Sequence, residues 1–276
     1  MRVQTIAEIG LNHNGDIDIA RQLIHVCKLA GVDYVKFQKR NPDKCVPEHQ
    51  KNVMRETPWG DMTYLDYKKK IEFQDSDYAD IDDYCSSIGM KWFLSVWDTD
   101  SVGTARRFRN PMIKIPSACI TDIDLLETVR DAKIPVILST GMSTMDMVDR
   151  AVDVLGNRLV CIMHCVSTYP SKAEEQNLLC IKTLEDRFRG IPIGFSNHHS
   201  GLTFLTVAPM LGAEVLEFHV TLDRSMWGTD QAASIEPEGI FHIVKRIRNI
   251  EKAMGDGEKR IMDSEVPIMK KLRCEQ

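Results

Sequence analysis

The sequence has no long hydrophobic run and no excess of positive charge. None of its apolar stretches approaches the roughly 20 residues that a membrane-spanning helix needs, and the formal net charge is −5. We therefore expect neither a membrane nor a nucleic acid as a partner. If the substrates are anionic, local cations must hold them against this overall balance.

The sequence also lacks a secretion signal and a pattern of paired cysteines. Residues 1–10 have no charged segment followed by an apolar one, so we expect a cytoplasmic protein. The 8 cysteines are scattered without a CxxC pair, and we expect no disulfide framework. Cys27, Cys85 and Cys161 lie in periodic apolar segments, which predicts buried thiols.

What is present is a series of short apolar runs rich in β-branched residues. Their near-continuous apolar character is typical of parallel strands that are covered on both faces. The eight predicted strands are Val3–Ile9, Asp33–Gln38, Lys91–Val96, Met112–Pro116, Pro135–Ser139, Leu159–His164, Pro192–Ser196 and Glu214–Val220.

A helical pattern follows each predicted strand. Eight alternations of strand and helix in 276 residues predict one TIM (β/α)8 barrel domain over residues 1–276. A doubly wound open sheet is the alternative, although it seldom runs to eight simple repeats. The predicted helices are Ile17–Ala30, Asp77–Ile88, Ser101–Phe108, Asp122–Ala132, Thr144–Leu155, Asn177–Phe188, Leu202–Leu211 and Pro237–Met254.

Two segments do not fit the simple repeat. Residues 39–76 form a connection that is too long for a compact barrel, with three prolines and a run of lysines. Such loops are usually functional or mobile, so we interpret it as a lid or substrate loop. A surface excursion or a subunit contact is an equal alternative. Residues 255–276 are predicted to form a polar, charged C-terminal tail, after which we expect no second domain.

Polar residues at strand ends point into the active site of a TIM barrel. The first strand runs into AEIGLNHNG, which places a carboxylate, amides and an imidazole within a few residues. A helix-capping turn would explain Asn14 and Asp16 in this stretch. It would not explain Glu8, which lies inside an apolar strand, so we predict a functional role for Glu8.

Two lysines lie inside buried strands, which is costly unless each meets an anion. Lys36 belongs to VKFQ at the end of the second strand, and Lys114 to KIPS at the end of the fourth. Taking these strands as neighbours, we infer a doubly charged or phosphorylated substrate. The alternative is a lysine–glutamate ion pair within the barrel, which explains one of the two more readily than both.

Hydroxyl groups and histidines end the later strands. The fifth strand runs into STGMS, whose hydroxyls and glycine before a helix could bind phosphate or carboxylate oxygens, or only cap that helix. His164, at the end of the sixth strand, is by itself best read as a core histidine with its hydrogen bonds satisfied.

Two histidines end the seventh and eighth strands. His198 and His219 follow adjacent strands, so both imidazoles can face one ion of Zn, Mn, Fe or Co. Few further protein ligands would leave positions open for water and substrate. The alternative is two separate hydrogen-bonded histidines. We interpret His199 as structural or supporting, and Asp230, in a loop over the eighth strand, could reach the same site.

At these residues the sequence resembles the N-acetylneuraminate (sialic acid) synthase family. The resemblance covers residues 3–265, and the ordered set of motifs is highly specific although each alone is weak. The motifs are AEIGLNHNG, VKFQ, KIPS, LSTGM, HCVSTYP, GFSNH, EFH and GTD, each at a strand end or just after it.

The resemblance implies a transferase of carbohydrate biosynthesis that joins phosphoenolpyruvate to a sugar aldehyde, typically N-acetylmannosamine, with Mn²⁺ or a similar metal. It implies metal ligands at His198 and His219, and a role near the metal and the aldehyde for Glu8. The residues implied to hold phosphoenolpyruvate are Lys36, Lys114, Ser117, Ser139 and Ser196. The residues implied to contact the sugar are Gln38, Tyr169 and Asp230.

The chemistry so implied agrees with the residues. The metal would polarise the aldehyde as a Lewis acid, and carbon 3 of phosphoenolpyruvate would attack it. Water would add at carbon 2, and the tetrahedral adduct would expel phosphate. The lysines would hold the anions and offset developing charge. Glu8 is our candidate for activating the water or passing a proton. A homo-oligomer, dimer or tetramer, is expected.

The sequence departs from the family pattern on the substrate side. Members of the family usually carry a small antifreeze-like domain after the barrel, which supplies an arginine to the sugar of the partner subunit, and we expect that contact to be absent here. Cys119 replaces a glutamate after KIPS, Ser95 begins SVWD where a serine–threonine–proline–phenylalanine stretch is usual, and Ser167 stands where many members have asparagine. We still assign Ser95 and Ser167 to substrate binding. The metal and lysine positions are intact, so the reaction class follows more directly than the sugar.

Three functions therefore compete. The first is the condensing synthase, including sister enzymes that use mannose, an acetamido-dideoxy sugar leading to legionaminic or pseudaminic acid, or arabinose 5-phosphate. The second is a metal-dependent aldolase or isomerase on the same barrel. The third is a non-catalytic binding or scaffold protein, which predicts a damaged histidine pair, whereas both histidines and both lysines are present.

Overall fold

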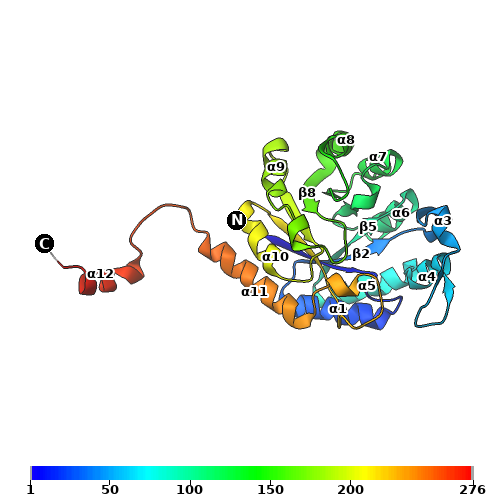
Figure 1. The fold of residues 1–276 in the computed structure, drawn as a ribbon, viewed down its shortest axis with the longest axis horizontal. Coiled ribbons are helices and arrows are strands. Elements are labelled where there is room, and N and C mark those ends of the chain that lie inside the picture. Colours follow the sequence, from blue (N-terminus) through cyan, green and yellow to red (C-terminus); the bar gives the residue numbers. More distant parts are fainter. Residues whose placement is uncertain (1, 275–276) are drawn as a thin grey trace.

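Eight parallel strands close into a barrel in the computed structural model, which describes residues 2–274 (Figure 1). The order around the barrel is β1-β10-β9-β8-β7-β6-β5-β2, and β2 pairs with β1 to close it. This confirms the predicted TIM barrel. The barrel strands are β1 (Gln4–Gly10), β2 (Tyr34–Lys39), β5 (Lys91–Val96), β6 (Ile113–Ile115), β7 (Val136–Ser139), β8 (Leu159–Cys165), β9 (Ile193–Asn197) and β10 (Val215–His219).

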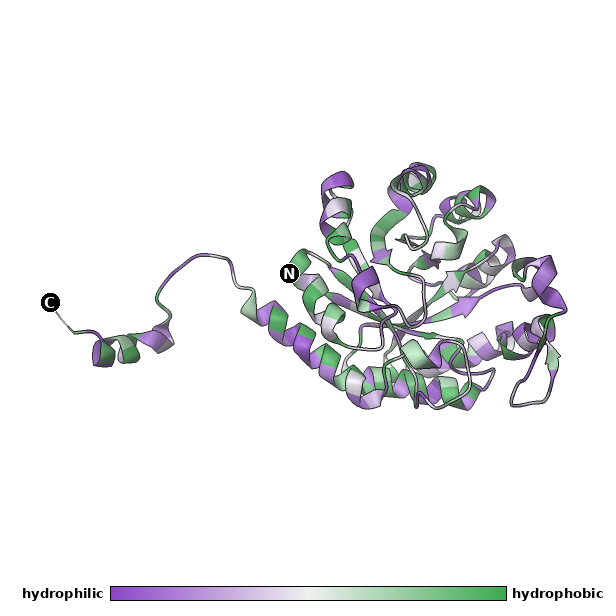
Figure 2. Ribbon diagram, viewed as in Figure 1, coloured by the Kyte–Doolittle hydropathy of each residue, from purple (hydrophilic) through white to green (hydrophobic). Residues whose placement is uncertain are grey.

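The helices surround the barrel and turn a buried stripe toward it. Helix α1 begins after Asp16, whose side chain accepts backbone N–H groups, and ends at Gly31 with a φ of 81°. Purple and green alternate along α11, as in an amphipathic helix (Figure 2). The barrel helices are α1 (Ile17–Ala30), α5 (Asp75–Ile88), α6 (Thr99–Arg107), α7 (Ile123–Asp131), α8 (Met145–Leu155), α9 (Cys180–Arg187), α10 (Thr203–Val207) and α11 (Pro237–Ala253).

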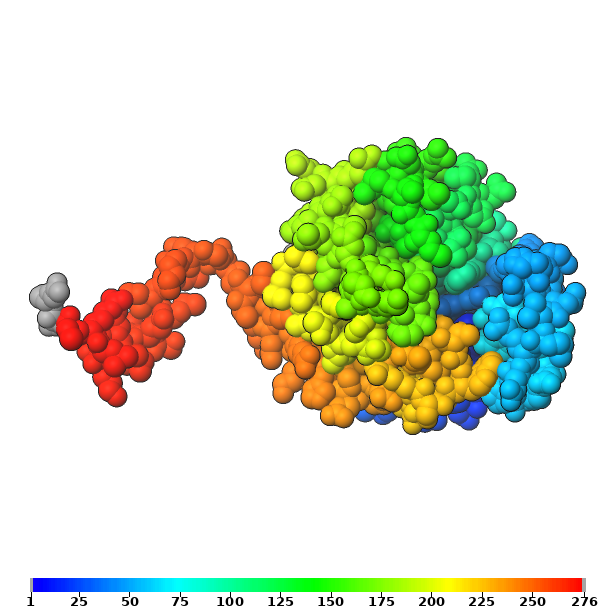
Figure 3. All heavy atoms as spheres, viewed as in Figure 1, coloured from blue at the N-terminus to red at the C-terminus, as the bar shows by residue number. Residues whose placement is uncertain are grey.

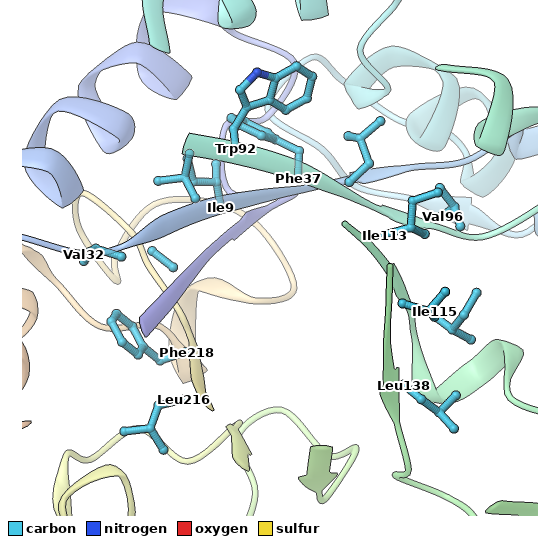
Figure 4. Close-up of a cluster of buried hydrophobic side chains, with 14 of the residues drawn as sticks. Ile9, Val32, Phe37, Trp92, Val96, Ile113, Ile115, Leu138, Leu216 and Phe218 are labelled. Carbon is cyan, nitrogen blue, oxygen red and sulfur yellow. The ribbon is translucent and has the colours of Figure 1, made fainter. Parts of the chain in front are cut away.

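The main core lies between the strands and the helices. Aromatic and branched side chains from β1, β2, β5 and β10 project outward from the barrel to meet helix faces (Figure 4). Among them, Phe37 and Trp92 pack edge to face, with ring centroids 6.3 Å apart. Cys27 and Cys85 are buried in this layer, as predicted, and the eight cysteines are present as thiols.

A second, smaller cluster fills the barrel interior below the site. It consists of Ile6, Phe93, Ile137, Cys161, Met163 and Val215. Because strand side chains alternate in direction, the residue two positions further along each strand also faces inward. On β1 that residue is Glu8, on β5 Ser95 and on β10 Glu217. The interior thus changes from apolar to polar toward the carboxyl ends of the strands, which is where TIM barrels place active sites.

The connection over residues 39–76 is present as predicted, but it has secondary structure that the sequence did not reveal. Its last helix packs on the loop after β10, because the rings of Tyr67 and Trp227 meet edge to face at 5.0 Å. In the space-filling view the blue and cyan residues of this excursion border the orange residues of that loop (Figure 3). Its elements are α2 (Pro42–Cys45), α3 (Glu48–Lys51), the antiparallel pair β3 (Met54–Arg55) and β4 (Met62–Thr63), and α4 (Tyr64–Ile71).

The C-terminal tail leaves the barrel after α11 and carries a short helix, α12 (Val266–Leu272), away from the body (Figure 1). The tail is less uniformly polar than expected, since Ile268 and Leu272 are exposed on α12. Met1, Glu275 and Gln276 lie outside the described residues. No helix within residues 2–274 is long and apolar enough to span a bilayer.

Candidate active site at the barrel mouth

One cavity at the carboxyl ends of the strands collects nearly all the predicted site residues. The exceptions are Ser196 and Asp230, which lie beside the cavity without lining it. The predicted residues that line it are Glu8, Lys36, Gln38, Ser95, Lys114, Ser117, Ser139, Ser167, Tyr169, His198 and His219.

Four buried charged side chains form the floor of the cavity. The Lys36 ammonium pairs with a carboxylate oxygen of Glu8, and the Lys114 ammonium lies 2.5 Å from a carboxylate oxygen of Glu217. A third contact of 3.7 Å joins Lys36 to Glu217. Both lysines therefore meet a glutamate, whereas the sequence favoured such an ion pair for one of them more than for both. The two strands are also not neighbours, because β5 lies between β2 and β6.

Neighbouring charges of the floor hold Glu217 and Lys36 in the ionised state. Although burial alone would raise the pKa of Glu217, the charges of Lys114 and Lys36 hold it well below its usual range. Burial alone would lower the pKa of Lys36, but Glu217 and Glu8 raise it. The floor is thus two cations balanced by two anions. Each lysine has three N–H donors, so each keeps donors free for a substrate anion.

Hydroxyl groups form the wall beside this floor. The Ser139 hydroxyl is buried and has no hydrogen-bond partner within the described residues, so it is free for a ligand. The Ser117 hydroxyl accepts the backbone N–H of Gly141 at 3.0 Å. A Cβ on Gly141 would come within 3.0 Å of the hydroxyls of Ser117 and Ser167, so only glycine allows these loops to meet.

The histidine rings of β9 and β10 lie 5.4 Å apart between their centroids. The Nδ1 atom of His198 lies 2.5 Å from the carbonyl oxygen of Val166. A carbonyl only accepts hydrogen bonds, so Nδ1 carries the proton and Nε2 keeps its lone pair. That Nε2 faces the Tyr169 hydroxyl at 3.2 Å. Burial, and then the charge of His219, lower the pKa of His198 to about 3, so this imidazole is neutral.

These histidines suit a metal that takes two imidazole ligands and fills its other positions with water or substrate. The Nδ1 of His219 is buried without a hydrogen-bond partner in the described chain, and the Val166 carbonyl orients His198 as carbonyls orient metal-bound imidazoles. Asp230 has a carboxylate oxygen 3.7 Å from His219 Nδ1. Nowhere in residues 2–274 do three or more acidic, histidine or cysteine side chains gather as a complete ligand set.

Two residues that are predicted to contact the substrates do not line the cavity, and their contacts stay predictions. Ser196 is expected to hold phosphoenolpyruvate, but its buried hydroxyl donates to Glu217 at 3.1 Å and so supports the floor from behind. Asp230 is expected to touch the sugar, but it stands beside His219. Gln38 does line the cavity, and its amide donates to Glu8 at 3.1 Å.

The residue that sequence reasoning missed is Glu217. It stands two positions before His219 on β10 and therefore faces the same way. A carboxylate in an apolar strand was the signal that singled out Glu8, and the same signal was present here. Two other histidines behave as predicted: His164 is a core residue whose Nε2 donates to a backbone carbonyl at 2.7 Å, and His199 lies on a loop and accepts the Gly201 N–H.

Comparison with known proteins places the chain among sugar-acid synthases. It is 35% identical to the N,N'-diacetyllegionaminic acid synthase of Legionella pneumophila, over 95% of this chain and 76% of that one. It is 33% identical to the N-acetylneuraminate-9-phosphate synthase of Mus musculus, over 97% and 75%. A crystal structure of an N-acetylneuraminic acid synthetase from Leptospira borgpetersenii superposes with a TM-score of 0.86 at 28% identity, over 100% of this chain and 94% of that one. The model of the NeuB family matches residues 23–259. The chain therefore belongs to the NeuB family.

Proposed function

We propose that this protein condenses phosphoenolpyruvate with an N-acetylmannosamine-like sugar aldehyde to give a sialic-acid-like nonulosonic acid and phosphate. Membership of a family of named synthases makes it a C–C bond-forming transferase. The observation that carries the proposal is the cavity itself, where the lysine floor, the free hydroxyls and the histidine pair face one another. A doubly ionised phosphate ester, a carboxylate and an aldehyde need these three kinds of group.

The reaction balances with one water. Carbon 3 of phosphoenolpyruvate forms a bond to the aldehyde carbon as the enol double bond is used, and the aldehyde oxygen takes a proton to become a hydroxyl. Water adds to carbon 2, and the bond from carbon 2 to the phosphate oxygen breaks. The products are a 2-keto acid and inorganic phosphate.

The side chains of the floor and wall bind and orient phosphoenolpyruvate. Lys36 and Lys114 offer N–H donors to its anionic oxygens, and the Ser139 hydroxyl adds a donor that nothing else occupies. Ser117 and Ser167 approach from the neighbouring loops. The lysines would also stabilise the negative charge that the departing phosphate carries.

Glu8 is the candidate for holding or moving the proton of the attacking water. Its carboxylate lines the cavity and is fixed by Lys36 and by the amide of Gln38. That fixation keeps the group oriented toward the reacting atoms. Gln38 on β2 and Tyr169 in the loop after β8 would position the sugar from opposite sides of the cavity.

His198 and His219 would hold a divalent metal, with Mn²⁺ the ion that we expect. Bound there, the ion would supply Lewis-acid polarisation of the aldehyde. The fit rests on the neutral state of His198, its orientation by a backbone carbonyl and the free nitrogen of His219. A cytoplasmic location and a homo-oligomeric state, dimer or tetramer, remain predictions.

Two alternatives share this site. A related 2-keto-3-deoxy sugar acid synthase would use another aldehyde, and a metal-dependent aldolase or isomerase would use the histidine pair without phosphoenolpyruvate. The free Ser139 hydroxyl and the two lysines in the same cavity favour a synthase over an aldolase or isomerase. An aldolase that acts on neutral sugars would have no use for an anion subsite of this kind.

The test is phosphate release from phosphoenolpyruvate across a panel of sugar aldehydes, with Mn²⁺ and with a chelator. We expect release only when both substrates are present, and its loss with chelator and in the His198→Ala, His219→Ala double variant. Metal content after dialysis, measured by mass spectrometry, should fall in that variant and not in the control His199→Ala. Full activity in the double variant would refute the metal assignment, and aldehyde turnover without phosphoenolpyruvate would indicate the aldolase.

A further inference from the structure

One side chain that lines the cavity has a role in neither the floor nor the histidine pair. Trp97 directly follows β5 and borders the cavity, in the SVWD stretch where this sequence departs from its family. Along β5, Phe93 belongs to the apolar cluster of the barrel interior, and Ser95 lines the cavity above it. Because inward-facing side chains alternate, Trp97 comes next, closer to the open end of the barrel. Trp97 therefore belongs to the rim of the site.

Contacts on several sides hold Trp97 in place. Its backbone N–H donates to the carbonyl oxygen of Lys39 at 3.1 Å. Its own carbonyl oxygen accepts the thiols of Cys45 at 3.5 Å and Cys119 at 3.6 Å. The Arg40 guanidinium covers one face of the ring, with its central carbon 4.0 Å from the ring centroid. Arg40 does not line the cavity, so the rest of the indole is what borders it, fixed before any substrate binds.

The indole N–H of Trp97 is a buried donor that the protein does not use. Its Nε1 atom has no hydrogen-bond partner within residues 2–274, whereas the buried Trp92 donates its indole N–H to Asp82 at 2.8 Å. A buried donor that is left without an acceptor is costly in free energy. On a side chain that lines a cavity, this cost is removed when a ligand supplies the acceptor.

The surroundings of this donor define the acceptor. An indole N–H only donates, so its partner must be an acceptor such as a carbonyl oxygen, and an ammonium group is excluded. The loop after β6 borders Trp97, since the Cys119 thiol contacts its carbonyl oxygen. From that loop Pro116 and Ala118 line the cavity, and neither offers a polar side chain. A donor beside small apolar groups suits a carbonyl oxygen that carries a methyl group.

The height of Trp97 above the floor indicates which substrate it meets. In the register of the strands, Lys36 lies beside Phe93 and Lys114 beside Ser95, so both lysines are deeper in the barrel than Trp97. Phosphoenolpyruvate, the smaller substrate, occupies the floor in the proposed reaction. The aldehyde is the substrate that extends from the histidine pair to the rim.

We propose that Trp97 determines specificity for the aldehyde by binding an acylamino group at carbon 2 of the sugar. The indole N–H donates to the acyl oxygen, and Pro116 and Ala118 contact the acyl methyl group. This inference rests on the proposed function, because it names the group of the aldehyde substrate that the rim recognises.

The kinetic test compares three aldehydes that differ only at carbon 2: N-acetylmannosamine, mannose and mannosamine, which carry an acetamido group, a hydroxyl and an ammonium group. We expect kcat/KM to be highest for N-acetylmannosamine. Trp97→Phe keeps an aromatic ring but removes the N–H, so KM for N-acetylmannosamine should rise about tenfold. KM for phosphoenolpyruvate and kcat/KM for mannose should stay near their wild-type values.

The matched control is Trp59→Phe, the same substitution at an indole that is 41% exposed on the excursion and does not line the cavity. It should leave the turnover of all three aldehydes unchanged, and Trp97→His, which puts back a ring N–H, should recover part of the preference. Equal losses for N-acetylmannosamine and mannose in Trp97→Phe, as a purely structural role predicts, would overturn the assignment. So would a wild type that does not favour N-acetylmannosamine.

Binding observed at the indole itself separates this subsite from the reaction. In protein with isotopically labelled tryptophan, each of the four tryptophans gives one indole N–H signal in the nuclear magnetic resonance spectrum, and Trp97→Phe identifies the signal of Trp97 by its loss. Without phosphoenolpyruvate, N-acetylmannosamine should move that signal downfield, as a new hydrogen bond does, and mannosamine should not. If the signal moves while no aldehyde releases phosphate, the condensation is wrong and the subsite stands. If phosphate is released but the signal does not respond to N-acetylmannosamine, the subsite is wrong.

Discussion

At the scale of single residues, Glu217 is the centre of the site. Its carboxylate is contacted by Lys114, by Lys36 and by the Ser196 hydroxyl, which belong to three different strands. A buried ion pair contributes little net stability compared with apolar packing, but removal of one partner leaves the other charge buried without a counterion. Glu217 therefore holds both lysines in place for a substrate anion.

Glu217→Gln should lower both stability and activity. The amide keeps the shape but leaves Lys114 buried without its anion, at a cost of about 3–5 kcal/mol. The free energy of unfolding from urea denaturation measures the first effect, and phosphate release the second.

The double variant Lys114→Met, Glu217→Gln provides the check on this reading. Because it removes the stranded charge together with its partner, it should recover much of the stability lost in Glu217→Gln, while activity stays lost. If the two single losses simply add in the double variant, Glu217 does not act through Lys114.

How far single residues could be predicted depended on the strand period. Glu8, Lys36 and Lys114 stood out because charge inside an apolar strand is rare, and the structure places all three on the cavity. What the sequence did not show is that glutamates already neutralise the lysines. Pairing across the barrel depends on which strands face each other, and that is set by closure of the sheet and not by any local pattern.

At the scale of elements, the strands were predictable and the excursion was not. Every predicted barrel strand occurs within two residues of its expected bounds, and β5 occurs as predicted at Lys91–Val96. These strands are buried on both faces, so their apolar runs are unbroken. The strands of the excursion, β3 and β4, have two residues each, which is too short for any period to appear.

Aromatic contacts with Trp227 help to hold the excursion to the barrel, and this can be tested by Trp227→Ala. The substitution removes the edge-to-face pair with Tyr67, worth about 1 kcal/mol beyond the buried area, so the open population of the excursion should rise about fivefold. The rate of tryptic cleavage at Arg55 measures that opening, and KM for the aldehyde should rise with it.

Phe241→Ala is the control, since this phenylalanine is exposed on α11 away from the excursion. It should leave both the cleavage rate and KM at wild-type values. An unchanged cleavage rate in Trp227→Ala would mean that the excursion does not depend on this contact. The interpretation of the excursion as a lid closed by the loop after β10 would then be wrong.

At the scale of the whole molecule, one polar cluster joins the two ends of the barrel sequence. Asp33, just before β2, accepts the backbone N–H and hydroxyl of Thr5 on β1 and the guanidinium of Arg248 on α11. Arg248 also donates to the backbone carbonyl of Val3. The first strand, its neighbour and the last barrel helix thus meet at the face opposite the site, which in a TIM barrel serves stability.

The charge on Asp33 should make the stability of the barrel depend on pH. Burial alone would raise its pKa, but the hydrogen bonds from Thr5 and Arg248 outweigh burial and lower it. A pKa that is lower in the folded state than in the unfolded state gives stability that is complete above the unfolded value, about 3.9, and is lost as the pH falls through the folded value.

Asp33→Asn should lower the free energy of unfolding by about 2 kcal/mol near pH 7. The difference from the wild type should shrink below about pH 4, as measured by urea unfolding at each pH. The exposed Asp153, replaced by Asn, should change neither. A difference in the free energy of unfolding between wild type and Asp33→Asn that stays constant down to pH 2 would contradict this prediction. It would show that Asp33 stabilises the barrel by its shape and hydrogen bonds and not by its charge.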